Sequence, residues 1–91
     1  METRNQYIER LSARLHEWDA QIDVLKARAE TAKEDARLSF KQQIIKLRED
    51  RERAADLLKE LHEAGEQNWM TIRQRVDDLI SDVKDIFRKA A

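Results

Sequence analysis

Apolar residues recur at steps of three and four along the first third of the chain, and mostly polar residues fill the positions between them. This stripe has nine members: Ile8, Leu11, Leu15, Trp18, Ile22, Leu25, Ala29, Ala32 and Ala36. An apolar residue about every 3.5 positions marks one narrow face of a helix, and that face has to be buried against another helix. The stripe therefore predicts a coiled-coil helix.

The stripe continues beyond Ala36 with one change of spacing. Two successive steps of four lead through Phe40 to Ile44, and such a stutter unwinds a left-handed supercoil locally without ending the helix. The pattern then resumes at further positions: Leu47, Arg51, Ala54, Leu58 and Leu61. Arg51 is the one charged member, and its aliphatic stem can lie on apolar surface. Because no Gly or Pro precedes Gly65, we predict one helix over residues 3–63, capped at its start by Thr3 or Asn5.

A second irregularity falls at Gly65. Steps of four lead from Leu61 to Gly65 and on to Trp69. Glycine often ends a helix in the left-handed conformation, and it costs about 1 kcal/mol inside one. We therefore predict a turn at residues 64–66 and a second helix over residues 67–89. The alternative is another stutter within one continuous helix.

These elements predict an all-α fold in which the shorter C-terminal helix folds back on residues 40–61 as a helical hairpin. That hairpin leaves the stripe from Ile8 to Ala29 without cover, so a second copy of the chain is expected to bury it. In the antiparallel dimer that we favour, each end is a three-helix bundle. The middle is two helices thick, at Ala29, Ala32 and Ala36. All nine stripe residues then belong to the oligomer interface. The alternative is a parallel coiled coil of straight helices.

Composition supports one elongated domain over residues 1–91. The chain has 41% charged residues, one Gly, no Pro and no Cys, a composition typical of long helices. The net charge is −1 with both signs interspersed, which argues against a nucleic-acid partner because such proteins usually carry a basic stripe. No apolar run is long enough for a transmembrane helix or a signal peptide, so a cytoplasmic location is expected.

The ionisable residues do not suggest a metal or cofactor site. His16 and His62 do not share a face of the predicted helix. Asp78, Asp82 and Asp85 do share one, but basic residues that can pair with them lie on the same helix, and no calcium-binding loop is present. We expect a solvated charged face there and no bound metal or cofactor.

Catalysis is not expected either. The chain has no cysteine nucleophile and no glycine-rich loop that would hold a phosphate. Trp18 and Trp69 occupy stripe positions, where aromatic side chains usually fill a core rather than line a ligand pocket. A long helical rod also lacks the large cavity that most active sites need.

Several short segments carry a resemblance to a known group of proteins. They are Tyr7-Ile8, Glu17-Trp18-Asp19, Ala32-Lys33-Glu34-Asp35-Ala36, and Gly65 followed by Trp69. Together they resemble small, uncharacterised bacterial coiled-coil proteins. The resemblance implies a cytosolic bacterial helical protein and supplies no activity, cofactor or site residue.

The sequence favours a non-enzymatic, homo-oligomeric coiled-coil module with a structural or protein-interaction role. The alternative is a protein whose amphipathic helices bind lipid or membrane surfaces. Such helices carry an excess of Lys and Arg on the polar face, whereas here the two signs are balanced.

Overall fold

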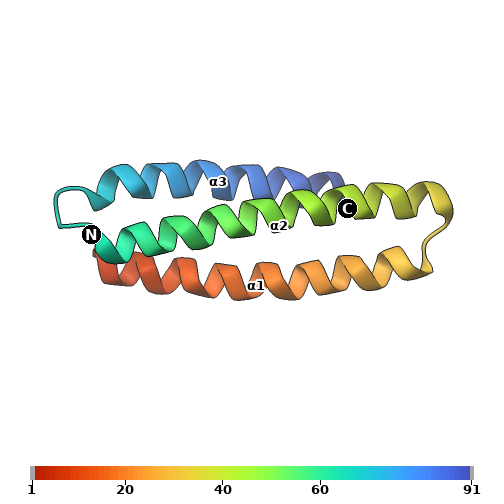
Figure 1. Ribbon diagram of the computed structural model, residues 1–91, viewed down its shortest axis with the longest axis horizontal. Coiled ribbons are helices and arrows are strands. Elements are labelled where there is room, and N and C mark those ends of the chain that lie inside the picture. Colours follow the sequence, from red (N-terminus) through yellow and green to blue (C-terminus); the bar gives the residue numbers. More distant parts are fainter. Residues whose placement is uncertain (1, 91) are drawn as a thin grey trace.

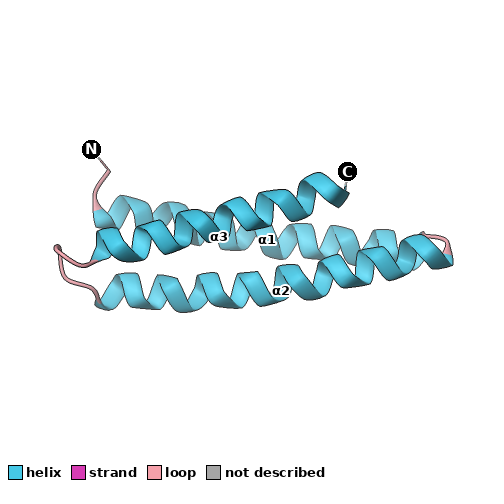
Figure 2. Ribbon diagram, turned by 90° about the horizontal axis from the view of Figure 1, so that it is seen from above, coloured by secondary structure: helices cyan, strands magenta, loops and turns pink. Residues whose placement is uncertain are grey.

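Three α-helices lie lengthwise against one another in the computed structural model, which describes residues 2–90 (Figure 1). They are α1 (Arg4–Thr31), α2 (Glu34–Glu63) and α3 (Trp69–Ala90). The molecule measures 50 × 21 × 18 Å. α1 packs against α2, α2 packs against α3, and each helix runs opposite to the one before it (Figure 2). The described residues contain no strand, which confirms the all-α prediction.

α1 begins with a capping box. The Thr3 hydroxyl oxygen accepts a hydrogen bond from the Gln6 backbone N–H at 3.2 Å, and the Gln6 side chain accepts one from the Thr3 N–H at 2.9 Å. The two bonds satisfy backbone donors that a helix start otherwise leaves unpaired. Thr3, rather than Asn5, is thus the cap.

The prediction of one helix over residues 3–63 is wrong, because the chain turns between α1 and α2. Ala32 and Lys33 are extended, with ψ of 154° and 159°. Arg37 supports the turn: its guanidinium donates to the backbone oxygens of Ala29 at 3.2 Å and Ala32 at 3.4 Å. The physical reason is burial, since the turn lets α2 cover the α1 stripe within one chain. That gain outweighs the local preference for helix.

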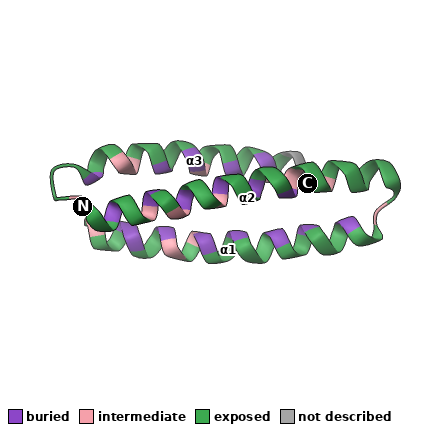
Figure 3. Ribbon diagram, in the orientation of Figure 1, coloured by how far each residue is buried: buried purple, intermediate pink, exposed green. Residues whose placement is uncertain are grey.

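The core takes residues from all three helices (Figure 3). Seven of the nine predicted interface residues, from Ile8 to Ala29, are buried within this single chain. The argument that only a second copy can cover them is therefore wrong. Ala32 is half-buried at the turn, and Ala36 is exposed on α2. The rest of the core comes from α2 and α3, together with Tyr7 of α1: Ile44, Leu47, Ala54, Leu57, Leu61, Trp69, Val76, Leu79, Val83 and Ile86.

The second connection, residues 64–68, lies where a turn was predicted, and α3 begins at Trp69, two residues later than expected. The expectation of a left-handed Gly65 is wrong. Its φ is not positive, and the chain leaves α2 through an extended Ala64, with φ −75° and ψ 142°. The Gly65 carbonyl accepts hydrogen bonds from the backbone N–H groups of Asn68 at 3.1 Å and Trp69 at 3.3 Å. The alternative of an unbroken helix through Gly65 is excluded.

The buried face of α2 is broader than the predicted stripe. Asp50 is only 3% exposed, whereas the neighbouring Arg51, the predicted charged member of the stripe, is half-buried. Leu57 is likewise more buried than Leu58. A helix that packs against two neighbours buries a wider arc than one in a two-stranded coiled coil. α2 lies between α1 and α3, and this explains the shift.

Candidate interaction surfaces

A groove with basic walls follows the seam between α1 and α2 near the turn that joins them. Ala29, Ile44 and Ile45 supply its apolar lining in a hollow of about 580 Å³. Around them stand charged side chains: Lys26, Arg37, Lys41 and Arg48, with Glu30 as the only acid. Four cations around an apolar lining form a surface that attracts anionic groups.

A second hollow, of about 600 Å³, continues the groove away from the turn and shares Lys26, Ile45 and Arg48 with the first. Its other walls are mostly carboxylates: Asp19, Asp23, Glu49 and Glu52. The one further cation, Arg51, is engaged by Asp19, with Nε 2.9 Å from Oδ1 and Nη2 3.1 Å from Oδ2. The charge along the groove therefore changes from basic beside the turn to acidic farther from it.

Two large apolar side chains of α2, Ile45 and Leu38, are exposed to solvent. Ile45 is 58% exposed and lines both hollows, and Leu38 is 60% exposed. They are seven residues apart, so they lie on the same face of α2. Single exposed apolar residues are ordinary on a protein surface, and of these two only Ile45 lines the groove. Their apolar character was evident in the sequence, whereas their exposure depends on where α1 and α3 pack.

Asp50 is a buried carboxyl group with incomplete hydrogen bonding, which the sequence analysis missed. Its Oδ1 lies 3.5 Å from Arg53 Nη1, and its Oδ2 has no hydrogen-bond partner among the described residues. Burial raises the pKa of Asp50 above its usual value, and the charges of Asp82 and Glu49 add to this rise. Arg53 and also Lys46 act in the opposite direction. Asp50 is thus a buried acid whose only close ion-pair partner among the described residues is Arg53.

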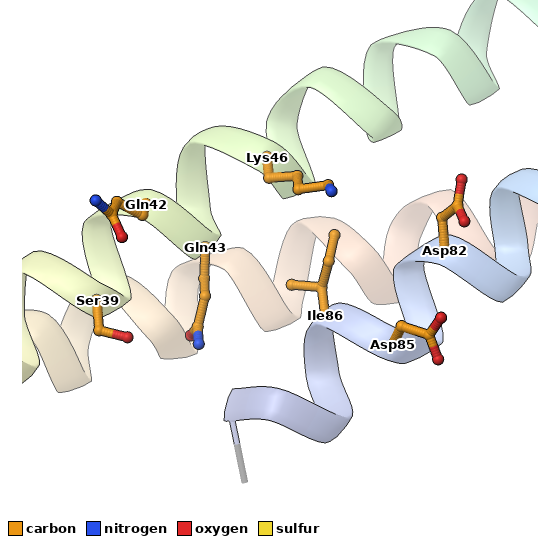
Figure 4. Close-up of a pocket in the computed structure, with 7 residues that line it drawn as sticks. All are labelled: Ser39, Gln42, Gln43, Lys46, Asp82, Asp85 and Ile86. Atoms are coloured by element: carbon orange, nitrogen blue, oxygen red, sulfur yellow. The ribbon is translucent and has the colours of Figure 1, made fainter.

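A polar cleft lies between the start of α2 and the end of α3 (Figure 4). Its volume is about 430 Å³, and its lining includes Gln43, Lys46, Asp82, Asp85 and Ile86. The Gln43 side-chain oxygen is buried and has no hydrogen-bond partner in the described part of the chain. The carboxylates come from α3 and the amine from α2 (Figure 4). The cleft is open to solvent, and the one hydroxyl in its lining, Ser39, makes no side-chain hydrogen bond to a base among the described residues.

Tyr7 joins the start of α1 to α3. It is 1% exposed, and its hydroxyl donates to Asp77 Oδ1 at 2.6 Å. Its ring lies 6.0 Å from the Trp69 ring, and the guanidinium groups of Arg10 and Arg73 each lie 5.1 Å from its centre. Burial, together with the bond to Asp77, raises the pKa of the Tyr7 phenol far above its usual range. The cluster joins α1 to α3, because the Tyr7 hydroxyl bonds to Asp77 and the Tyr7 ring packs beside Trp69 and Arg73.

The other predicted features are scattered over the fold. Trp18 and Trp69 are 4% and 6% exposed and belong to the core. His16 and His62 are both exposed, on α1 and α2 respectively. Within residues 2–90, no group of three or more His, Asp or Glu side chains is placed to hold a metal ion. None of the helices described is both long enough and apolar enough to cross a bilayer.

Comparison of the chain with protein-family models, curated proteins and solved structures gives no match. The resemblance to bacterial coiled-coil proteins therefore stays a prediction. The interpretation of function depends on the surfaces described above.

Proposed function

We propose that the chain is a non-enzymatic, homo-oligomeric helical module of the cytoplasm with a structural or protein-interaction role. One observation carries the proposal: the apolar spacing of three and four runs on through the turn, from Ala29 by way of Ala32, Ala36 and Phe40 to Ile44. A turn within one chain does not require this continuity, because the residues before and after it belong to different helices. Continuous spacing is what a helix needs when it packs along a partner.

The single chain leaves the middle of this stretch poorly covered. Ala36 is exposed, and Ala32 and Phe40 are half-buried. The end of α3 reaches Ser39 and Gln43 of α2, so the α1–α2 turn projects beyond it (Figure 1). Association with a second copy through this end would bury apolar surface that folding of one chain does not.

Sedimentation equilibrium over about a thousandfold range of protein concentration tests the proposal. We expect the mass to rise from one chain, 10.8 kDa, towards two as concentration increases. A mass of one chain at every concentration would refute self-association.

A second candidate function is attachment to an anionic lipid surface. The observation in its favour is the basic half of the groove, where Lys26, Lys41 and Arg48 stand beside the exposed Ile45. Cations next to exposed apolar side chains are typical of proteins that bind anionic lipid headgroups.

Vesicle flotation tests the lipid candidate. Phosphatidylserine-containing vesicles should carry the wild-type chain and the Val24→Asp control, which alters a 51% exposed apolar residue of α1 outside the groove. Phosphatidylcholine vesicles should carry neither, and Ile45→Asp should reduce flotation on the anionic ones. No flotation of the wild-type chain on anionic vesicles would exclude this candidate.

A further inference from the structure

We propose that two copies of this chain exchange α1, so that the α1 of each copy packs on α2 and α3 of the other. The proposal rests on the self-association proposed above and specifies its mechanism. In the exchanged dimer residues 32–33 are helical, and α1 and α2 form one continuous rod.

No residue in the connection between α1 and α2 is of a type that favours a turn over a helix. The connection consists of Ala32 and Lys33, with no Gly, Pro or Asn beside them. Lys33 occupies the N-cap of α2 and makes no side-chain capping bond in the described structure, in contrast to Thr3 at the start of α1. Alanine and lysine are good helix formers. The local sequence therefore favours a helix at the point where the closed chain interrupts it.

In the closed chain, contacts from residues outside the turn hold it in place. The Arg37 guanidinium caps the end of α1 by donating to the backbone oxygens of Ala29 and Ala32. The burial of α1 against α2 supplies the rest of the stabilisation. A second copy of the chain can provide that burial equally well.

Exchange preserves the contacts that α1 makes along its length. The Asp19–Arg51 ion pair, the bond from Arg4 to the Ala64 carbonyl and the bond from Tyr7 to Asp77 all join α1 to α2, α3 or the connection between them. All can form unchanged when α1 comes from a second copy. The closed and exchanged forms then differ mainly at residues 32–33 and in the entropy of association, so concentration controls the balance between them.

The antiparallel register of α1 on α2 fits the exchanged form. Continued through a straight helix, the register set by Asp19–Arg51 and Arg4–Ala64 brings Ala29 close to Phe40 of the second copy. It likewise brings Lys33 close to Ala36 of the second copy. One residue of each pair, Ala29 or Ala36, has a small side chain, so the two rods can approach closely. Ala32 and Ala36, which the closed chain leaves half-buried and exposed, lie in the seam between the two rods in this form.

Lys33→Pro separates the two forms. Lys33 has φ −64° and the preceding Ala32 has ψ 154°, values that suit proline and the residue before it. A straight helix has no place for that proline, since it removes one hydrogen bond and clashes with the preceding turn. With one such site in each copy, the variant should weaken association by about 10⁴-fold.

Lys33→Ala is the matched control, because it removes the same charge and favours the helix. It should associate at least as tightly as the wild type in sedimentation equilibrium. Equal association by Lys33→Pro and Lys33→Ala would overturn the exchange while leaving self-association intact. A wild-type chain that stays single at all concentrations would refute both proposals.

Mixing two charge-reversed chains gives an independent test. Asp19→Arg places two cations together in a closed chain, and Arg51→Asp places two carboxylates together. In a mixed dimer with exchanged α1, both sites regain opposite charges. Native mass spectrometry at low salt, where exposed ion pairs are least screened, should show mixed dimers in excess of their statistical share. A purely statistical share would contradict the exchange.

Discussion

Replacement of Asp50 by alanine should stabilise the protein. The Asp50 carboxylate is 3% exposed, with one oxygen 3.5 Å from Arg53 and the other unpartnered among the described residues. A buried acceptor without a hydrogen bond costs about 1–3 kcal/mol. Because alanine is smaller than aspartate, the substitution adds no volume to a core that already holds Ala54 one turn away. We therefore expect the free energy of unfolding to rise by about 1–3 kcal/mol at neutral pH.

Urea unfolding followed by circular dichroism measures this change, at a concentration where the chain is single. The matched control is Asp56→Ala, which alters an exposed aspartate of the same helix. Both variants gain the same helix propensity, so their difference isolates the cost of burial. Equal effects of the two substitutions, or destabilisation by Asp50→Ala, would refute the reasoning. Such a result would mean that Asp50 is fully hydrogen-bonded in solution.

The pH dependence of stability provides a second measurement of the same effect. Because burial raises the pKa of Asp50, the folded state holds its proton to a higher pH than the unfolded state does. The contribution of Asp50 to stability therefore falls as pH rises from the usual Asp pKa of about 3.8 through the raised folded value. The advantage of Asp50→Ala should accordingly shrink as pH falls through the same window.

Three further substitutions test other parts of the structure. Leu15→Asp places a charge at a position that is 7% exposed in the core, and it should cost at least about 3 kcal/mol; an unchanged thermal melt would contradict the placement of α1. Tyr7→Phe removes the 2.6 Å bond to Asp77 and should cost about 1.5–3 kcal/mol in urea unfolding, whereas no loss would mean that the bond is not made. Gly65→Ala should raise the free energy of unfolding by about 0.4–1 kcal/mol, because Gly65 has no positive φ and no atom lies within 4 Å of the added methyl group. Destabilisation by Gly65→Ala would instead indicate the left-handed cap.

Periodicity predicted most of the buried residues, because each large apolar residue of the first stripe lies in the core. Periodicity did not predict that the first stripe is covered by helices of the same chain. The turn at Ala32 and Lys33 has no local signal, and it exists because α2 covers the stripe once the chain reverses. A local reading of the sequence therefore favours a straight helix at this point.

The candidate surfaces depended still more on tertiary structure. Asp50 faces the core because α3 widens the buried arc of α2. A pattern for two packed helices instead puts the neighbouring residue, Arg51, at the buried position. Ile45 and Leu38 are large apolar residues of α2, yet both are exposed. Only the packing of the neighbouring helices decides which apolar residues of α2 remain available to a partner.

The reversal of the chain at residues 32–33 is tested most directly by the distance between the start of α1 and the end of α2. Cysteine variants at Asn5 and His62 can carry two dyes for energy transfer, because the chain has no other cysteine and both positions are exposed. In the dilute single chain we expect efficient transfer, since Arg4 contacts the Ala64 carbonyl. A straight helix would separate the two positions by about 85 Å, more than the 50 Å length of the closed molecule. Absence of transfer within the dilute single chain would contradict the fold described here.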